Sequence, residues 1–301
     1  MSSGRRSIPP SEKITLRVVA LVLLLSLQWG GNAVAIKIAL EGVPPVGLAG
    51  MRFLVGLISI YTWARTNRIP LAIERGEPVH LIAMALLFTI QILFLNAGVH
   101  HTLAGHSSVL INTFPFFVAL LAHFFVPGDR ISGRKVLGLI LAFSGVFSVF
   151  QGTWEETRGS DHLLGDLFVL ISGFLLGAKA VYTKRLLAYI NPYKLLVWQM
   201  LFSLIPFFAI SAAAEGISSY HFSTRVVGAI LYQGFFVAGF CFVTWTLLLK
   251  RHSPSKLSVF FFATPLFGVG LSHLFLSEEV VPGLALGMTL VALGIYIVNR
   301  A

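Results

Sequence analysis

Ten apolar stretches follow one another along this 301-residue chain, and only short segments separate them. Each is close to the roughly 20 residues that a helix needs to cross about 30 Å of hydrocarbon. The stretches are continuous rather than alternating, which favours helices over the strands of a membrane barrel. We therefore predict an all-α integral membrane protein with ten transmembrane helices. The predicted helices cover residues 16–37, 46–64, 79–99, 104–125, 133–150, 163–184, 194–213, 226–249, 256–276 and 280–298.

The composition agrees with a chain whose solvent is lipid. Hydrophobic residues make up 56% of the sequence and charged residues 11%, whereas a soluble domain carries about 25% charge. The net charge of +10 could indicate nucleic acid, but no basic run is interleaved with aromatic residues. We therefore expect a lipid bilayer and no nucleic acid as partner. The one cysteine, Cys241, lies in an apolar run and excludes an internal disulfide and a cysteine metal cluster.

Lysine and arginine residues indicate the orientation. With the N-terminus in the cytoplasm, seventeen of the 22 lie in cytoplasmic segments, and the outer loops hold only Arg158 and Arg225. This bias is the positive-inside pattern, so we predict a multi-pass protein of the inner (plasma) membrane with both termini in the cytoplasm. The other three, Lys37, Arg52 and Lys179, lie within spans or at their outer ends.

The second half of the chain repeats the first. A shift of 147 residues places Gly30 on Gly177, and a shift of 150 residues places Pro115 on Pro265. Each copy holds five spans, an odd number, so the second copy must enter the membrane upside down. Such an inverted-topology repeat is typical of secondary transporters, whose substrate binds near the midplane between the halves. We predict a cytoplasmic tail (1–15), a first repeat (16–152) and a second, inverted repeat (163–301) around a central cavity.

Several short motifs in a fixed order resemble one known family. They are WGGNAVAIK from Trp29, the pair Arg52-Phe53, a mid-span proline in spans 4 and 9, an acidic residue before spans 5 and 10, and LLGDLF from Leu163. In order and spacing the chain resembles the ten-helix EamA-type branch of the drug/metabolite transporter superfamily, and within it is most similar to the YddG-type aromatic amino-acid exporters. The resemblance implies a basket of ten helices around a central cavity, with spans 5 and 10 at the periphery. The glutamate that small four-helix multidrug exporters of the superfamily carry in their first span is absent here.

Polar residues of spans 1 and 6 are the first candidates for substrate binding. Lys179 is a cation within an apolar span, which costs about 2.5–3.5 kcal/mol unless it meets a cavity or a partner. Its repeat equivalent is Asn32, with Gln28 one turn earlier and Trp29 beside it, and Tyr182 follows on the polar face of span 6. An ammonium can hold a carboxylate or phosphate, and amides can hold the rest of a polar head. The alternatives are that Lys179 snorkels to the inner surface and that the amides only bond between helices.

Aromatic residues deep in the later spans complete the candidate substrate site. They are Trp198 beside Gln199, Tyr232, Trp245 and the run Phe260–Phe262. An aromatic wall beside a few polar groups suits an amphipathic, partly aromatic solute. For any one of these residues, ordinary core packing is the alternative.

Two prolines and a histidine are candidates for gating. Pro115 and Pro265 free backbone carbonyls within their spans and can kink the helices, so we expect paired hinges. His106, with His100 and His101, lies where spans 3 and 4 meet outside and could form a pH-sensitive outer gate; hydrated loop histidines are the alternative. With no carboxylate or cysteine nearby in the sequence, we expect no metal site.

The residues favour transport over catalysis. The chain holds no Gly-x4-Gly-Lys-Ser/Thr loop for ATP and no evident catalytic set, and we expect no cofactor. No carboxylate lies at hydrophobic depth, since Asp166 is only a turn inside its span, so a facilitator fits at least as well as a proton antiporter.

We predict a secondary transporter, and not an enzyme, that exports amino acids and related metabolites by alternating access. Aromatic or other amphipathic amino acids are the expected substrates, and the protein is expected to be a monomer or homodimer. The alternatives are a cationic multidrug exporter of the same fold, which Lys179 disfavours by charge repulsion, and an intramembrane enzyme that modifies lipid or lipid-linked sugar.

Overall fold

The computed structural model describes residues 11–102, 104–151, 162–216, 220–276 and 283–301, and within these ranges every regular element is a helix. The first half holds α1 (Leu16–Leu40), α2 (Pro45–Thr66), α3 (Glu77–His101), α4 (Ala104–Ile111), α5 (Phe114–Phe125) and α6 (Gly133–Phe150). The second half holds α8 (Leu163–Leu186), α9 (Pro192–Ala214), α10 (Thr224–Tyr232), the π-helix η3 (Gln233–Cys241), α11 (Phe242–Arg251), α12 (Pro254–Ser258), the 3₁₀ helix η4 (Val259–Phe262), α13 (Ala263–Leu276) and α14 (Leu284–Asn299).

These helices confirm the predicted class of an all-α membrane protein. Among the described residues, nine helices are long and apolar enough to span a membrane, and Leu284–Asn299 is a shorter apolar helix. The tenth predicted span began at residue 280, and residues 277–282 lie outside the described ranges. Most helices start where the sequence supplies a cap or a proline, as at Thr15 before α1 and Asn191 before α9, because these residues satisfy or replace free backbone N–H groups.

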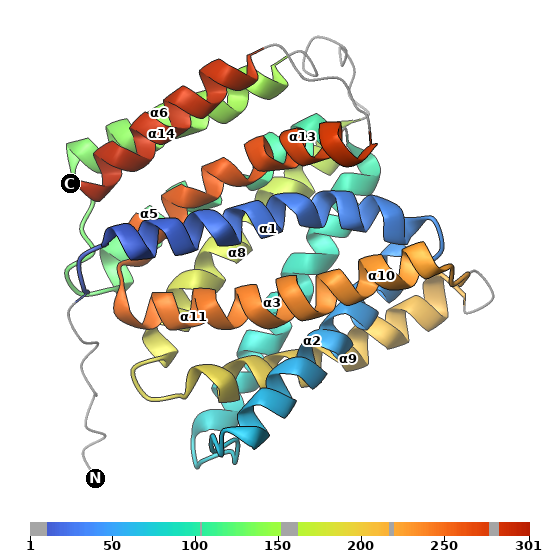
Figure 1. The fold of residues 1–301 in the computed structure, drawn as a ribbon. Helices are drawn as coiled ribbons and strands as arrows, with labels where there is room; N and C mark the ends of the chain where they lie inside the picture. The colour runs from blue at the N-terminus through green and yellow to red at the C-terminus, as the bar shows by residue number, and fades with distance from the viewer. Residues whose placement is uncertain (1–10, 103, 152–161, 217–219, 277–282) are drawn as a thin grey trace.

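Helices of the two halves pack in mirrored pairs (Figure 1). Helix α1 packs on α13, and its repeat equivalent α8 packs on α5. The glycine pair Gly30 and Gly177 lies in these two contacts: a Cβ on Gly30 would stand 2.8 Å from the Gly268 nitrogen, and one on Gly177 would stand 2.9 Å from Cβ of Phe117. These two glycines, which helped to identify the repeat, therefore lie where two helices approach closely.

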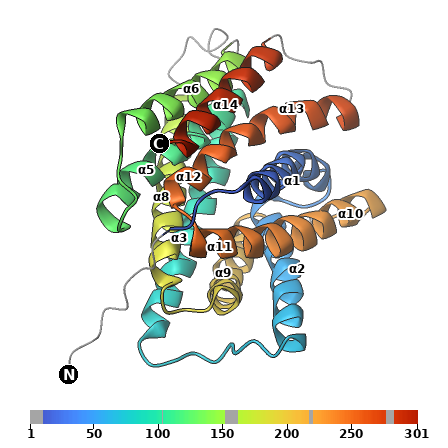
Figure 2. The ribbon, with the colours of Figure 1, turned by 60° about the vertical axis from the view of Figure 1, so that its left-hand side comes forward.

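Helices α6 and α14 lie side by side at one edge of the bundle (Figures 1 and 2). Their glycines face each other: a Cβ on Gly145 would stand 2.7 Å from the Gly287 carbonyl oxygen, and one on Gly138 would stand 2.8 Å from that of Gly294. Small residues let helix backbones approach this closely inside a membrane. The resemblance implied this peripheral position for spans 5 and 10.

The two spans that carry the predicted hinge prolines are interrupted shortly before them, whereas α9 continues unbroken through Pro206. Helix α4 ends at Ile111 and α5 begins at Phe114, just before Pro115. In the second half the 3₁₀ helix Val259–Phe262 separates α12 from α13, just before Pro265. A proline removes a backbone hydrogen bond and disturbs the preceding turn, which explains the matching breaks. The π-helix η3 in span 8 was not predicted.

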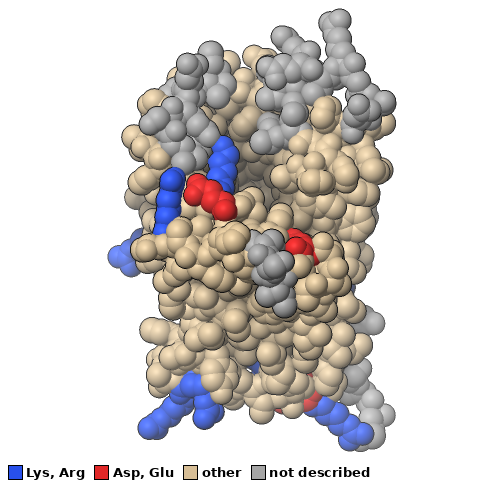
Figure 3. Space-filling model, turned by 90° about the vertical axis from the view of Figure 1, so that its right-hand side faces the viewer, with Lys and Arg blue, Asp and Glu red and all other residues tan. Residues whose placement is uncertain are grey.

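The two ends of the bundle differ in charge. Helix α1 begins and α14 ends on the left of Figure 1, and the Lys256 ammonium donates to the Ala301 carbonyl oxygen at 2.6 Å there. We call this end, which carries most of the described lysines and arginines, the basic end. The end at which α1 stops and α2 starts is the opposite end. Figure 3 views the molecule from the right of Figure 1, and most of the surface that it shows is uncharged.

Candidate functional site

A pocket lies between α1, α8, α9, α11 and η4, in the half of the bundle nearer the basic end. It has about 620 Å³ of empty volume, part of it open to solvent. Five residues that the sequence suggested for substrate binding line it: Trp29, Lys179, Gln199, Trp245 and Phe261. The rest of its lining is apolar apart from two threonines. Residues that lie far apart in the sequence, from the first repeat (Trp29) and from the second, therefore meet in one concave, mostly apolar site.

Lys179 places its ammonium against aromatic rings. The Nζ atom lies 4.3 Å from the ring centre of Phe88 and 5.3 Å from that of Phe242. Among the described residues it has no hydrogen bond or ion pair, and its electrostatic contacts are cation–π contacts with the faces of these two phenyl rings. A cation over an aromatic face is stabilised by about 0.5–2 kcal/mol. That stabilisation leaves the three N–H donors free for a ligand.

The direction of Lys179 argues against snorkelling. Side chains on a helix lean toward its N-terminus, and α8 begins at the opposite end, so Lys179 leans away from the basic end. Lys179 is seven residues from the end of α8 at Leu186, and Phe88 is eleven from the start of α3 at Glu77. At 1.5 Å per residue these positions lie roughly 10 Å and 16 Å from the basic end. The ammonium therefore points inward, toward the middle of the bundle.

The pocket also holds an aromatic wall and an unpaired amide. Trp29 stacks on Phe261 with ring centres 4.5 Å apart, and Trp245 meets both rings edge-on at 6.0 and 4.8 Å. Gln199 is buried, and neither polar atom of its amide has a hydrogen-bond partner in the described chain. Buried polar groups normally have partners, so this amide is available to a bound solute.

The other predicted binding residues do not line the pocket. Trp198 donates from Nε1 to the Leu71 carbonyl oxygen at 2.8 Å, and the Tyr182 hydroxyl lies 2.7 Å from Nδ1 of His80. Gln28 accepts from the Tyr232 hydroxyl at 2.8 Å, so two candidates bind each other. Asn32 leaves Oδ1 buried with no partner among the described atoms, outside the pocket.

Comparison with known proteins identifies the family. The sequence profile of the EamA-like transporter family matches residues 16–151 and 163–300. This chain belongs to the EamA-like transporter family. It is 27% identical to a probable amino-acid metabolite efflux pump of Escherichia coli, over 92% of this chain and 93% of that one. It is 25% identical to an uncharacterised transporter of Bacillus subtilis, over 93% and 96%. One solved crystal structure superimposes with a TM-score of 0.82 at 16% identity, covering 94% of this chain and 96% of that one.

The histidine candidate of this EamA transporter has a partner that the sequence did not indicate. Asp166 of α8 accepts from the Thr102 hydroxyl at 2.5 Å and lies 3.2 Å from Nδ1 of the buried His106. The expectation that no carboxylate lies near this histidine is wrong, because helix packing brings together residues 60 positions apart. No group of three or more potential metal ligands occurs in the described part of the chain.

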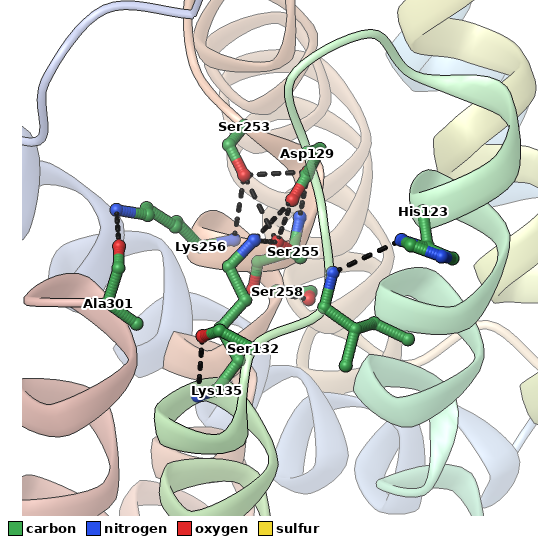
Figure 4. Close-up of polar contacts among 10 residues, drawn as sticks. His123, Asp129, Ser132, Lys135, Ser253, Ser255, Lys256, Ser258 and Ala301 are labelled. Carbon is green, nitrogen blue, oxygen red and sulfur yellow. Dashed lines mark hydrogen bonds and ion pairs between the residues drawn. The ribbon is translucent and has the colours of Figure 1, made fainter.

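The EamA transporter also has a buried polar cluster at the basic end that sequence reasoning missed (Figure 4). Asp129, between α5 and α6, accepts from Lys135 Nζ at 2.6 Å, from the Ser253 hydroxyl at 2.7 Å and from the Ser255 hydroxyl. The two serines flank the start of α12, so the cluster joins the two repeats. The sequence showed Asp129 only as the acidic residue before span 5.

Proposed function

We propose that this EamA-family transporter exports amino acids, in particular aromatic or other amphipathic ones, and related metabolites by alternating access. The observation that carries the proposal is the pocket in which the unpaired Lys179 ammonium lies beside the wall of Trp29, Trp245 and Phe261. The ammonium attracts a carboxylate, the wall receives an apolar side chain, and the free Gln199 amide binds the amino group through its carbonyl oxygen. A single pocket thus offers a partner for each part of an amphipathic amino acid.

Named relatives support this substrate class. Proteins of Escherichia coli and Salmonella typhimurium at 27% and 25% identity are described as probable amino-acid metabolite efflux pumps. A cationic solute is disfavoured because Lys179 would repel it.

The described lining of the pocket contains no carboxylate, so we propose a facilitator that needs no proton exchange in the pocket. We further propose that the basic end faces the cytoplasm of a cell with this protein in its inner membrane.

The test is uptake into liposomes that contain the purified protein. Radiolabelled L-phenylalanine is compared with phenethylamine, which has the same ring and amine but no carboxylate, and protein-free liposomes are the control. We expect saturable uptake of L-phenylalanine and little of phenethylamine, without an imposed pH gradient. Saturable uptake of the amine without the amino acid would replace the proposal with cation export. An absolute need for a pH gradient would refute the facilitator and direct attention to His106 with Asp166.

A further inference from the structure

Arg52 is a second half-buried cation within a span that has no hydrogen bond or ion pair among the described residues, and it does not line the pocket. Its guanidinium carbon lies 4.7 Å from the ring centre of Phe53, and its buried Nε has no hydrogen-bond partner among the described atoms. The buried lysines at the basic end differ, because Lys135 and Lys194 bond to carboxylates. An unpaired cation at membrane depth is costly and commonly functional. Arg52 therefore requires an explanation.

Arg52 and Lys179 lie at mirrored depths. Arg52 is seven residues from the start of α2 at the opposite end, and Lys179 is seven residues from the end of α8 at the basic end. At 1.5 Å per residue each lies about 10 Å inside its own end of the bundle. The two unpaired cations are thus placed on either side of the middle of the bundle, one in each repeat.

Three phenyl rings in contact with one another link the two cations, and we call Phe53, Phe88 and Phe242 the phenyl barrier. The ring centre of Phe53 is 4.7 Å from that of Phe88 and 6.1 Å from that of Phe242, and the latter two are 6.2 Å apart. Arg52 lies over Phe53, whereas Lys179 lies over the other two rings. Of the three rings, Phe242 lines the pocket. Together with the mirrored depths of the two cations, these contacts put the phenyl barrier on the way from one cation to the other.

One ring of the barrier directly follows an irregular helix segment. The π-helix Gln233–Cys241 ends at the residue before Phe242. Short π-helical segments are strained relative to α-helix and are frequent at functional sites. Conversion of this segment to α-helix would rotate the following helix and shift Phe242. The barrier thus has a structural means of opening.

We propose that Arg52 is a second anion-binding site, which receives the carboxylate of the substrate from Lys179 when the phenyl barrier opens. The proposal rests on the proposed function and extends it: the substrate must carry an anionic group, and each cation serves one face of the membrane. Lys179 binds the anion that enters from the basic end, and Arg52 binds it at the opposite end. While the substrate occupies either site, the three aromatic rings keep the path between the two sites closed.

The test compares half-saturating concentrations of L-phenylalanine measured from each membrane face. Whole cells and inside-out vesicles present opposite faces, and the variants are Arg52→Gln, Arg52→Lys, Lys179→Met and the exposed control Arg65→Gln. When substrate is added at the opposite end, we expect Arg52→Gln to raise the half-saturating concentration by about 10- to 100-fold, as loss of a charge-assisted hydrogen bond predicts. When substrate is added at the basic end, the half-saturating concentration of this variant should equal that of the wild type. Lys179→Met should show the reverse, and Arg52→Lys should retain most affinity. Equal effects of Arg52→Gln on both faces would overturn the proposal.

A binding measurement separates this proposal from the proposed function. The melting temperature of detergent-purified protein is recorded with sodium benzoate, a carboxylate on a phenyl ring, and with sodium chloride at equal ionic strength. We expect benzoate to stabilise the wild type, each single variant less, and the double variant Arg52→Gln/Lys179→Met not at all. If the wild type transports no amino acid but the four proteins show these benzoate shifts, the proposal of amino-acid export is wrong and the two anion-binding sites are confirmed. If Arg52→Gln alone leaves the benzoate shift unchanged, the second site is wrong.

Discussion

At the scale of single residues, Lys179 and Gln199 are distinguished by having no hydrogen-bond partner among the described residues. Lys135, Lys184 and Lys194 near the basic end are buried but bonded to carboxylates or backbone carbonyls. Lys179 has only the faces of aromatic rings, and Gln199 has no partner in the described chain. Bonded lysines hold the fold together, whereas an unbonded one is available to bind a solute.

Lys179→Met keeps most of the side-chain length but removes the charge and the donors. We expect the half-saturating concentration for L-phenylalanine to rise by about 10- to 100-fold, because a hydrogen bond to a charged group contributes roughly 1.5–3 kcal/mol. Thermal stability should hold or improve, since an unpaired charge leaves the membrane. Lys179→Arg should keep part of the affinity, because the charge remains with altered geometry.

The control for this prediction is Lys13→Met, an exposed lysine before α1. Both variants are measured in liposomes at matched protein levels. Wild-type affinity in Lys179→Met would show that the ammonium does not bind substrate and would leave the aromatic wall as the site.

At the scale of elements, the segment between α5 and α6 is tied to the start of α12 through Asp129. Burial alone would raise the pKa of this carboxyl, but the hydrogen bonds from Lys135 and Ser255 and the lysine charge lower its pKa below the ordinary 3.8. The ionised form is therefore favoured in the folded protein. Since one connection belongs to each repeat, the charge on Asp129 helps to hold the two repeats together at the basic end.

Asp129→Asn should destabilise the protein at pH 7 by about 3 kcal/mol, because it leaves the buried Lys135 ammonium without an opposite charge. The folded-state pKa lies below the unfolded one, so the carboxylate stabilises the fold at pH values above 3.8 and this contribution is lost as pH falls through the lowered pKa. The difference in melting temperature between wild type and variant should therefore be constant from pH 7 to about pH 5 and shrink in stronger acid.

Two further variants check the origin of this effect. Glu41→Gln removes an exposed carboxylate 3.9 Å from Arg225 and should change the melting temperature little, since exposed ion pairs contribute about 0–1 kcal/mol. Asp129→Asn/Lys135→Met removes both buried charges and should recover part of the loss. A variant as stable as the wild type at pH 7 would show that the cluster does not stabilise the fold.

At the scale of the whole molecule, the bundle has two chemically different ends and a pocket nearer one of them. The basic end carries the start of α1, the end of α14 and most of the cations that the structure describes. Positive residues are retained on the cytoplasmic side of a membrane. The pocket with Lys179 would then lie in the cytoplasmic half, where an exporter collects its substrate.

Labelling of single cysteines tests this orientation. In a Cys241→Ala background, Glu41→Cys at the opposite end should react with a membrane-impermeant thiol reagent added to intact cells. Asn67→Cys at the end of α2 should react only after the cells are opened. Both positions are exposed, so access depends on the side of the membrane alone. The reverse pattern would refute a cytoplasmic basic end.

The sequence by itself determined the helical class, nine of the ten predicted spans and the repeat. Lipid offers no hydrogen bonds to a backbone, so each crossing must be a largely helical, apolar stretch, and such a stretch can be recognised in the sequence alone. Gly30 with Gly177 and Pro115 with Pro265 showed the repeat, because close packing and helix breaks depend on local residue type.

Only the tertiary structure decided which polar residues share the pocket. Trp198 is an aromatic residue deep in its span and was therefore predicted to bind substrate, but its indole N–H donates to the Leu71 carbonyl oxygen. Its neighbour Gln199 lines the pocket instead. The difference is the rotation of α9 about its axis, about 100° per residue, which packing against α2 and α3 sets. The contacts of Lys179 with Phe88 and Phe242 likewise join three helices. Such contacts arise only when the helices assemble, since no local pattern in an apolar span records which neighbour it will meet.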